Sequence, residues 1–186
     1  WQQPNLYVLA VTTRNAETGE PLDLARERFG FRECWIEGSH LIFNGHPIRL
    51  QGVVNTGGAM FMQNAPPLSR DTFFMVDTFD ETGCLSGQLI TGLVNTPSKY
   101  NVESDLFWET TEANALMDLK RYWNHPSIIA WDLSNEWHYY AFSTGADMEL
   151  CARRFLHLSQ VVEQLDPTRW TFFNGEALWL EGPPDE

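Results

Sequence analysis

The sequence is poor in basic residues and has no long hydrophobic run. Its 186 residues include 12 Lys and Arg against 25 Asp and Glu, a formal net charge of −13. Such an acidic chain lacks the positive surface that nucleic acids and anionic membranes require of a binding partner. No stretch reaches the roughly 18 apolar residues of a transmembrane helix. We therefore expect neither a nucleic-acid nor a membrane partner, which leaves sugars and other uncharged substrates open.

Cysteine is also scarce, and the sequence motifs of common cofactor sites are missing. Cys34, Cys84 and Cys151 form no C-x-x-C pair, so neither a disulfide framework nor a zinc site is indicated. The dinucleotide, P-loop and nucleophile-elbow motifs are absent. The histidines show no metal-ligand spacing, and we interpret His125 as structural. We expect no cofactor and no metal. The first residues lack the features of a signal peptide, and the sequence leaves the cellular compartment open.

The first fifty residues predict β structure. We expect strands at residues 6–13 and 28–37, separated by polar turn residues. Asn44-Gly45 lies between two apolar stretches. Because both residues tolerate positive φ, this dipeptide predicts a hairpin turn.

From about Gly52 onward, helical and strand patterns alternate, which is typical of parallel α/β architecture. We expect helices over residues 70–81, 110–123 and 148–165, and strands over 84–90, 127–133 and 170–173. One face of the helix at 110–123 is marked by Ala113, Leu116, either Leu119 or Lys120, and Trp123. The last helix has a clearer apolar stripe, with Asp147 before it and Asp166-Pro167 after it. The stripe comprises Met148, Cys151, Phe155, Leu158, Val162 and Leu165.

Polar residues follow the apolar strand at 127–133. The segment 134–138 reads Ser-Asn-Glu-Trp-His, and α/β proteins place their chemistry at this end of a parallel strand. In a regular strand Asn135 and Glu136 would point to opposite faces. Both can serve one site only if the backbone bends there.

The segment 124–137 resembles the Asn-His-Pro-Ser…Asn-Glu signature of glycoside hydrolase family 2, the β-galactosidase, β-mannosidase and β-glucuronidase group. Three other segments resemble that family in the same order. These are 4–7 (end of its immunoglobulin-like sandwich), 29–52 (entry into its barrel) and 80–83 (the turn before its third barrel strand). The resemblance covers most of the chain.

The resemblance implies a retaining mechanism with two glutamates. It assigns Glu136 the acid/base role and Asn135 a hydrogen bond to the sugar 2-hydroxyl. Trp137 and His138 are further candidates for substrate contact. The other reading of Glu136 is a rim carboxylate in an ion pair. Aromatic residues could form sugar-stacking platforms or fill the core; they are Trp131, Trp137, Tyr139, Tyr140 and Trp179.

The chain also departs from the family pattern. A complete (β/α)₈ barrel takes about 250 residues, so residues 48–186 can hold about four and a half units. The family's nucleophile follows its seventh strand, and we expect it outside this chain. The segment 53–65 is too short for a βα unit and has no arginine. We expect residues 1–37 to be the end of a sandwich domain and 38–186 to be about strands 1 to 5 of a TIM-type barrel with a shortened second unit.

The sequence thus predicts an incomplete retaining β-glycoside hydrolase with a carbohydrate substrate. One alternative is a non-catalytic, carbohydrate-binding or structural descendant of the same barrel. A weaker one is a (β/α)₈ glycosidase of another family, such as a mannanase or cellulase. An incomplete barrel also predicts self-association, because it leaves a strand edge open.

Overall fold

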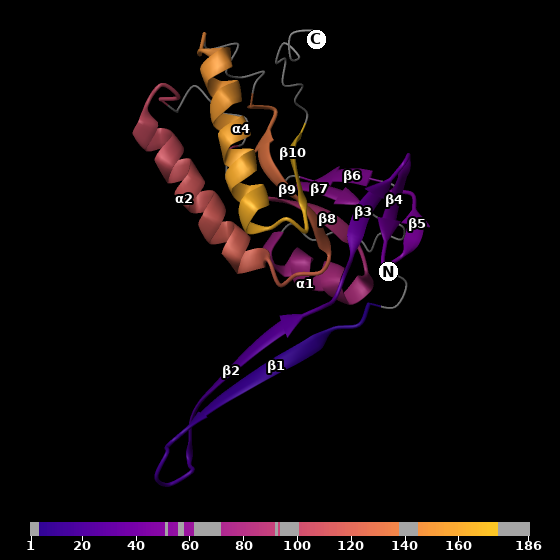
Figure 1. Ribbon diagram of the computed structural model, residues 1–186, viewed down its shortest axis with the longest axis vertical. Helices are drawn as coiled ribbons and strands as arrows, with labels where there is room; N and C mark the ends of the chain where they lie inside the picture. Colours follow the sequence, from indigo (N-terminus) through magenta and orange to yellow (C-terminus); the bar gives the residue numbers. More distant parts are fainter. Residues whose placement is uncertain are drawn as a thin grey trace.

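The computed structural model describes residues 4–50, 52–55, 58–61, 72–91, 93, 101–137 and 145–174. Its strands form three sheets, of two, three and five strands. Figure 1 shows the two-stranded sheet projecting from a body that contains the other two sheets and the helices.

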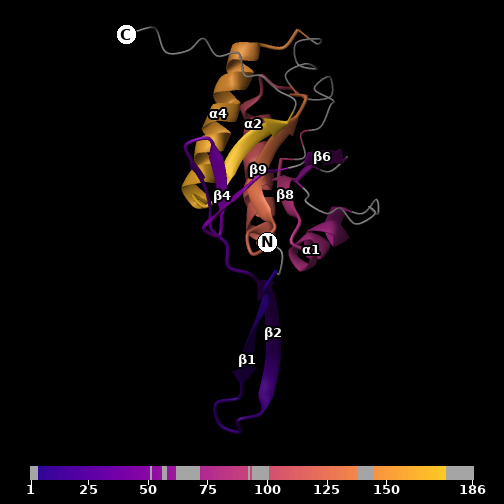
Figure 2. The ribbon, with the colours of Figure 1, turned by 90° about the vertical axis from the view of Figure 1, so that its right-hand side faces the viewer.

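The two-stranded sheet is a long antiparallel ribbon of β1 (Tyr7–Arg14) and β2 (Pro21–Phe29). Both views show it extending away from the helices (Figures 1 and 2). The predicted extended segment at 28–37 is therefore wrong in its limits: one strand starts at Pro21, and a separate strand starts at Cys34. Three consecutive charged residues, at positions 26–28, interrupt the alternation along β2 and hid its strand pattern from the sequence.

The three-stranded sheet contains the predicted hairpin. It consists of β3 (Cys34–Glu37), β4 (His40–Phe43) and β5 (His46–Ile48), all antiparallel. Asn44 and Gly45 join β4 to β5 with φ of 49° and 78°. The two positive φ values are those of the tight hairpin turn predicted from Asn-Gly, which is confirmed.

The five-stranded sheet has the order β10-β9-β8-β7-β6. Strands β8 (Leu85–Leu89), β9 (Ile128–Asn135) and β10 (Trp170–Asn174) run parallel. Helices α2 (Asp105–Tyr122) and α4 (Met148–Leu165) form the crossovers β8-α2-β9 and β9-α4-β10, and α1 (Thr72–Thr82) leads into β8. These predicted strands and crossovers are confirmed.

The remaining two strands of this sheet form a hairpin before β8. Strands β6 (Gly52–Asn55) and β7 (Gly58–Phe61) pair antiparallel, and β7 pairs antiparallel with β8. Among the described strands of this sheet, β8, β9 and β10 therefore pair in parallel, and β7 runs opposite to the other four. The shortened second unit and the count of about five barrel strands both stay predictions.

Helix α1 (Thr72–Thr82) ends one residue before Gly83, which has a φ of 72°. Helix α2 (Asp105–Tyr122) begins five residues before the predicted start. Its predicted face is wrong except for Leu119, because the burial of two polar or amphipathic residues, Thr111 and Tyr122, rotates the buried stripe. The buried residues are Trp108, Thr111, Ala115, Leu119 and Tyr122.

Helix α4 (Met148–Leu165) follows its sequence pattern closely. The Asp147 side chain caps it, accepting a hydrogen bond from the backbone N of Leu150 at 3.0 Å. The predicted stripe is buried at Cys151, Phe155, Leu158 and Val162, but Leu165 at its end is half exposed. This buried face packs on the parallel strands together with Leu119 of α2 and residues of β9.

A buried arginine ties the start of β9 to the ends of two helices. Arg169 donates to the carbonyl oxygens of Trp123, His125 and Ile128, and its Nη1 lies 2.6 Å from Asp166 Oδ2. Burial alone would raise the pKa of Asp166. The hydrogen bond from Thr168 is the largest of the opposing effects, followed by the charge of Arg169 and the hydrogen bonds from Arg169 and Trp131. Together they outweigh burial and hold the pKa of Asp166 below its usual value. Both members of this buried pair are thus charged and extensively hydrogen-bonded, which is the condition for burying an ion pair.

The aromatic core predicts a large effect of truncating Phe155, which is 1% exposed and packs edge-to-face on Trp108 and Trp137. Phe155→Ala should lower the free energy of unfolding by about 3–5 kcal/mol, because it leaves a cavity. Urea unfolding followed by far-UV circular dichroism measures this. The control is Leu106→Ala on α2, where the side chain is 70% exposed and the change should stay within about 0.5 kcal/mol. Equal effects would contradict the packing.

Candidate active site

The candidate site lies at the C-terminal end of β9. This strand is buried along its length except for Asn135, which is half-buried, and the next residue, Glu136, is exposed. Two parallel neighbours, β8 and β10, flank it. The structure thus places the predicted acid at the strand end where α/β proteins position their chemistry.

Glu136 has an unusual backbone conformation. Its φ is 49°, and among the described residues only Asn44 shares a positive φ without being glycine. Asn44 occupies a tight turn, where this conformation is common, whereas it is rare and costly for a glutamate. The bend that Asn135 and Glu136 require in order to serve one site is therefore present.

The last residues of β9 also contain a bulge. Asp132 pairs with Phe172 and Asn135 with Asn174, so three steps along β9 match two steps along β10. The additional residue shifts the alternation of side chains between faces, and bulges of this kind re-aim side chains beside active sites. The bulge and the left-handed Glu136 together change the direction of the strand end.

Trp137 lies in the core rather than on an open surface. Its side chain is 0% exposed and contacts Phe155 edge-to-face with a ring-centroid separation of 5.2 Å. The ring centroid of Trp108 lies 6.0 Å from that of Trp137. Trp131 is likewise buried, and its indole N–H donates to Asp166 at 3.0 Å. Substrate contact by Trp137 stays a prediction. His138, Tyr139, Tyr140 and Trp179 lie outside the described residues.

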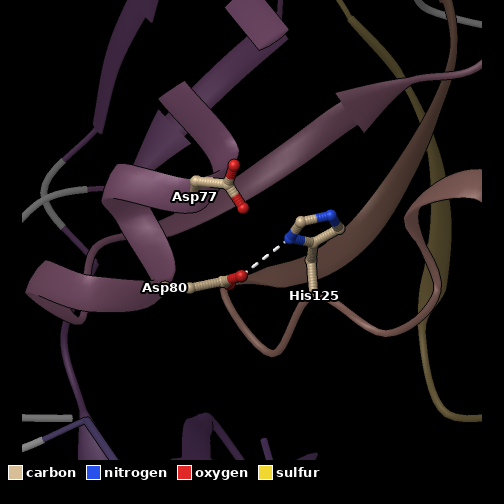
Figure 3. Close-up of side chains that lie close together, drawn as sticks. All are labelled: Asp77, Asp80 and His125. Carbon is tan, nitrogen blue, oxygen red and sulfur yellow. Dashed lines mark hydrogen bonds and ion pairs between the residues drawn. The ribbon is translucent and has the colours of Figure 1, made fainter. Parts of the chain in front are cut away.

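A second polar cluster lies at the opposite ends of the strands (Figure 3). Asp80 is 3% exposed; its Oδ2 lies 2.7 Å from His125 Nδ1, and its Oδ1 accepts from the backbone N of Ser127 at 3.0 Å. This confirms the structural role predicted for His125. Asp80 itself was missed, because a carboxylate near a helix end is normally solvated.

Asp77 lies beside Asp80 and His125. One potential ligand atom from each of the three side chains lies within 4.8 Å of the others, close enough for a metal ion. The three side chains already interact with other protein groups. Arg28 pairs with Asp77 and with Glu81 of α1, and both carboxylate oxygens of Asp80 accept hydrogen bonds or an ion pair. The arrangement therefore fastens the ribbon and the loop before β9 to α1.

Comparison with known proteins identifies the family of this chain. The family model described as "Glycosyl hydrolases family 2, TIM barrel domain" matches residues 71–181, more than half of the chain. The chain belongs to glycosyl hydrolase family 2. The family predicted from the Asn-His-Pro-Ser and Asn-Glu segments is confirmed, and the described strands are a partial TIM-barrel-type fold. The mannanase or cellulase reading is set aside.

Individual proteins resemble the chain over nearly its whole length. A protein of Formosa agariphila with a provisional β-glucuronidase name is 29% identical, over 91% of this chain and 23% of the relative. The β-glucuronidase of Parabacteroides merdae superposes with a TM-score of 0.69 at 19% identity, over 92% of this chain and 24% of that one. The chain thus spans about a quarter of the length of these relatives.

Two further structures have the same fold and contain bound sugar-like molecules. Bacteroides uniformis β-glucuronidase 2, covalently bound to cyclophellitol-6-carboxylate aziridine, gives a TM-score of 0.68 at 22% identity, over 92% of this chain and 24% of that one. The family 2 β-galacturonidase of Eisenbergiella tayi, bound to galacturonate, gives a TM-score of 0.63 at 20% identity, over 91% of this chain and 32% of that one. Among the described helices, none is long and apolar enough to cross a bilayer.

The left-handed conformation of Glu136 makes a stability prediction that does not depend on catalysis. Glu136→Gly and Glu136→Ala both remove the carboxyl group, but only glycine adopts a φ of 49° without steric cost. The glycine variant should be more stable than the alanine variant by about 1 kcal/mol. Urea unfolding of both variants measures the difference. An alanine variant of equal or greater stability would show that the backbone at Glu136 is unstrained.

Proposed function

We propose that Glu136 is the general acid/base of a retaining β-glycoside hydrolase, and that this chain is part of that longer enzyme. In this role its carboxyl group protonates the departing glycosidic oxygen and then deprotonates the water that releases the sugar. The observation that carries the proposal is the exposed, left-handed Glu136 directly after a buried parallel strand. Strained backbone of this kind persists where the surrounding structure holds it, and it clusters at active sites.

The other substrate-binding roles follow the same assignment. We propose that Asn135 hydrogen-bonds the sugar 2-hydroxyl and that Trp137 and His138 contact the substrate. The nucleophile is a second carboxylate from a later part of the enzyme, outside this chain. A carboxylate can perform nucleophilic attack as well as proton transfer, so the reaction needs neither a metal nor a cofactor.

For the substrate, we propose a β-linked uronic acid. The support is the names of the relatives: three described above are β-glucuronidases, one by provisional name, and the fourth is a β-galacturonidase bound to galacturonate. Glucuronic and galacturonic acids are both sugar carboxylates, so a β-glucuronide is the appropriate first test substrate.

For the domain organisation, we propose that residues 1–37 end a β-sandwich and that residues 38–186 begin the barrel. The support is the ribbon, where Tyr7, Leu9 and Val11 alternate along one face of β1 and are about half exposed. An isolated two-stranded ribbon is marginally stable in water, and an apolar face on a strand pair is typical of the inner layer of a sandwich. Further strands of the longer protein would cover this face.

One observation favours the non-catalytic alternative. The β6–β7 hairpin occupies the place of a complete βα unit, and the loop after each barrel strand helps to form the sugar pocket in an active TIM barrel. A sugar-binding module without turnover therefore remains the second candidate function. Activity of the longer protein separates the two.

The acid role predicts a dependence on the leaving group. In the longer protein, Glu136→Gln should reduce kcat/KM for phenyl β-glucuronide by about 10²–10⁴-fold, because this ratio reports the glycosylation step, in which a poor leaving group requires protonation. The kcat/KM for 4-nitrophenyl β-glucuronide should fall much less, since the activated phenolate leaves without a proton. Steady-state kinetics on both substrates measures this. Equal losses would contradict the acid role, and an inactive wild-type protein would favour the non-catalytic alternative.

The 186-residue chain expressed alone should behave differently from the enzyme. Strand β10 is at the edge of the five-stranded sheet, and open edges promote association, so sizing chromatography should show oligomers. Without the nucleophile the chain cannot form a glycosyl-enzyme, and it should not hydrolyse 4-nitrophenyl β-glycosides. A purified monomer with turnover that Glu136→Ala abolishes would contradict the assignment of the nucleophile to another part of the protein.

A further inference from the structure

Leu133 and Ser134 lie in the bulge at the end of β9: the register with β10 passes from Asp132 to Asn135 and pairs neither residue. Both residues are 0% exposed. Buried backbone groups must be hydrogen-bonded, so a bulge at this depth needs partners from outside the ladder. Side chains of two neighbouring residues supply them.

Thr91, in the segment that follows β8, is the first of these residues. It is 6% exposed, and its hydroxyl donates to the carbonyl of Leu133 at 2.7 Å. The same oxygen accepts from the backbone N of Leu93 at 3.1 Å. The carbonyl of Leu93 then accepts from the backbone N of Asn135 at 3.0 Å. One hydroxyl therefore connects the turn after β8 to both sides of the bulge, up to the residue before Glu136.

Asp132 is the second of these residues. It is 1% exposed, and its Oδ1 accepts from the backbone N of Ser134 at 3.2 Å. Its own carbonyl accepts from the backbone N of Ile90, which precedes Thr91, at 3.1 Å. Asp132 thus accepts a hydrogen bond from the backbone N–H of Ser134, while Thr91 donates one to the backbone carbonyl of Leu133.

We propose that Thr91 is a positioning residue for the acid/base: its hydroxyl fixes the bulge in β9 and thereby the direction of Glu136. The proposal rests on the catalytic role proposed for Glu136. Thr91 does not touch the substrate in this account; it acts through the Leu133 carbonyl and the Leu93 amide. A misplacement of about 1 Å at a catalytic group can cost about 10²-fold in rate, which sets the scale of the effect.

The test uses Thr91→Val, which keeps the shape of the side chain and removes the hydroxyl, in the longer protein. We expect kcat/KM for phenyl β-glucuronide to fall about 10–100-fold and kcat/KM for 4-nitrophenyl β-glucuronide to change much less. Thr91→Ser, which keeps the hydroxyl, should restore most of the lost rate. If Thr91→Val prevents folding, Thr91→Cys retains a weak donor of similar size and should give the same pattern with a smaller loss.

The matched control is Thr111→Val. Thr111 is 4% exposed, and its hydroxyl donates to the carbonyl of Phe107 within α2 at 2.9 Å. It is therefore a buried threonine with a backbone hydrogen bond away from β9. The ratio of rates on the two substrates should be unchanged in Thr111→Val. A loss in Thr91→Val that is equal on both substrates, or that Thr91→Ser does not restore, would overturn the positioning role.

A double variant separates this inference from the proposed function. If Thr91 acts through Glu136, Thr91→Val should cause no further loss on phenyl β-glucuronide when Glu136→Gln is already present. Additive losses would overturn the inference alone. Absence of leaving-group dependence in Glu136→Gln itself would instead overturn the proposed function.

Discussion

The described structure depends on how β9 is held at its two ends. At its start, Arg169 donates to the Ile128 carbonyl and to two carbonyls of the preceding turn, and Asp166 balances its charge. At its end, Thr91 and Asp132 satisfy the backbone groups of a bulge. Between these points the strand is fully buried. A strand fixed in this way can hold Glu136 at a φ of 49°, a conformation that a free chain end would relax.

The other elements position β9 rather than contribute to the candidate site themselves. Helices α2 and α4 cover the parallel strands with the apolar cluster that includes Leu119, Leu158 and Val162. At the opposite end of the strands, Asp80 holds the loop before β9 through His125 and Ser127, and Arg28 connects the ribbon to α1. The polar groups at the two ends of the strands therefore differ in role. Those around Asp80 fasten the loop before β9, whereas Glu136 at the other end is exposed to solvent.

Local patterns predicted much of this structure, and longer-range contacts decided the rest. The stripe of α4, the Asn44-Gly45 turn and the strands around β9 follow from residue spacing, and the Asn-His-Pro-Ser and Asn-Glu segments indicated the family. The start and buried face of α2 did not follow, because Thr111 and Tyr122 are buried by tertiary packing. The need for a bend at Glu136 could be deduced from strand alternation. The bulge beside it could not, because it depends on the register with β10 and on Thr91, more than forty residues earlier in the chain.

The most direct measurement is the distance between the carboxyl group of Glu136 and the nucleophile in a crystal structure of the longer protein with a covalently trapped glycosyl intermediate. The account predicts about 5–5.5 Å between the two carboxyl groups, the spacing of retaining glycosidases, with the Glu136 carboxyl beside the bond that was cleaved. A spacing above about 6.5 Å, as in inverting enzymes, or a Glu136 carboxyl directed away from the sugar, would contradict it.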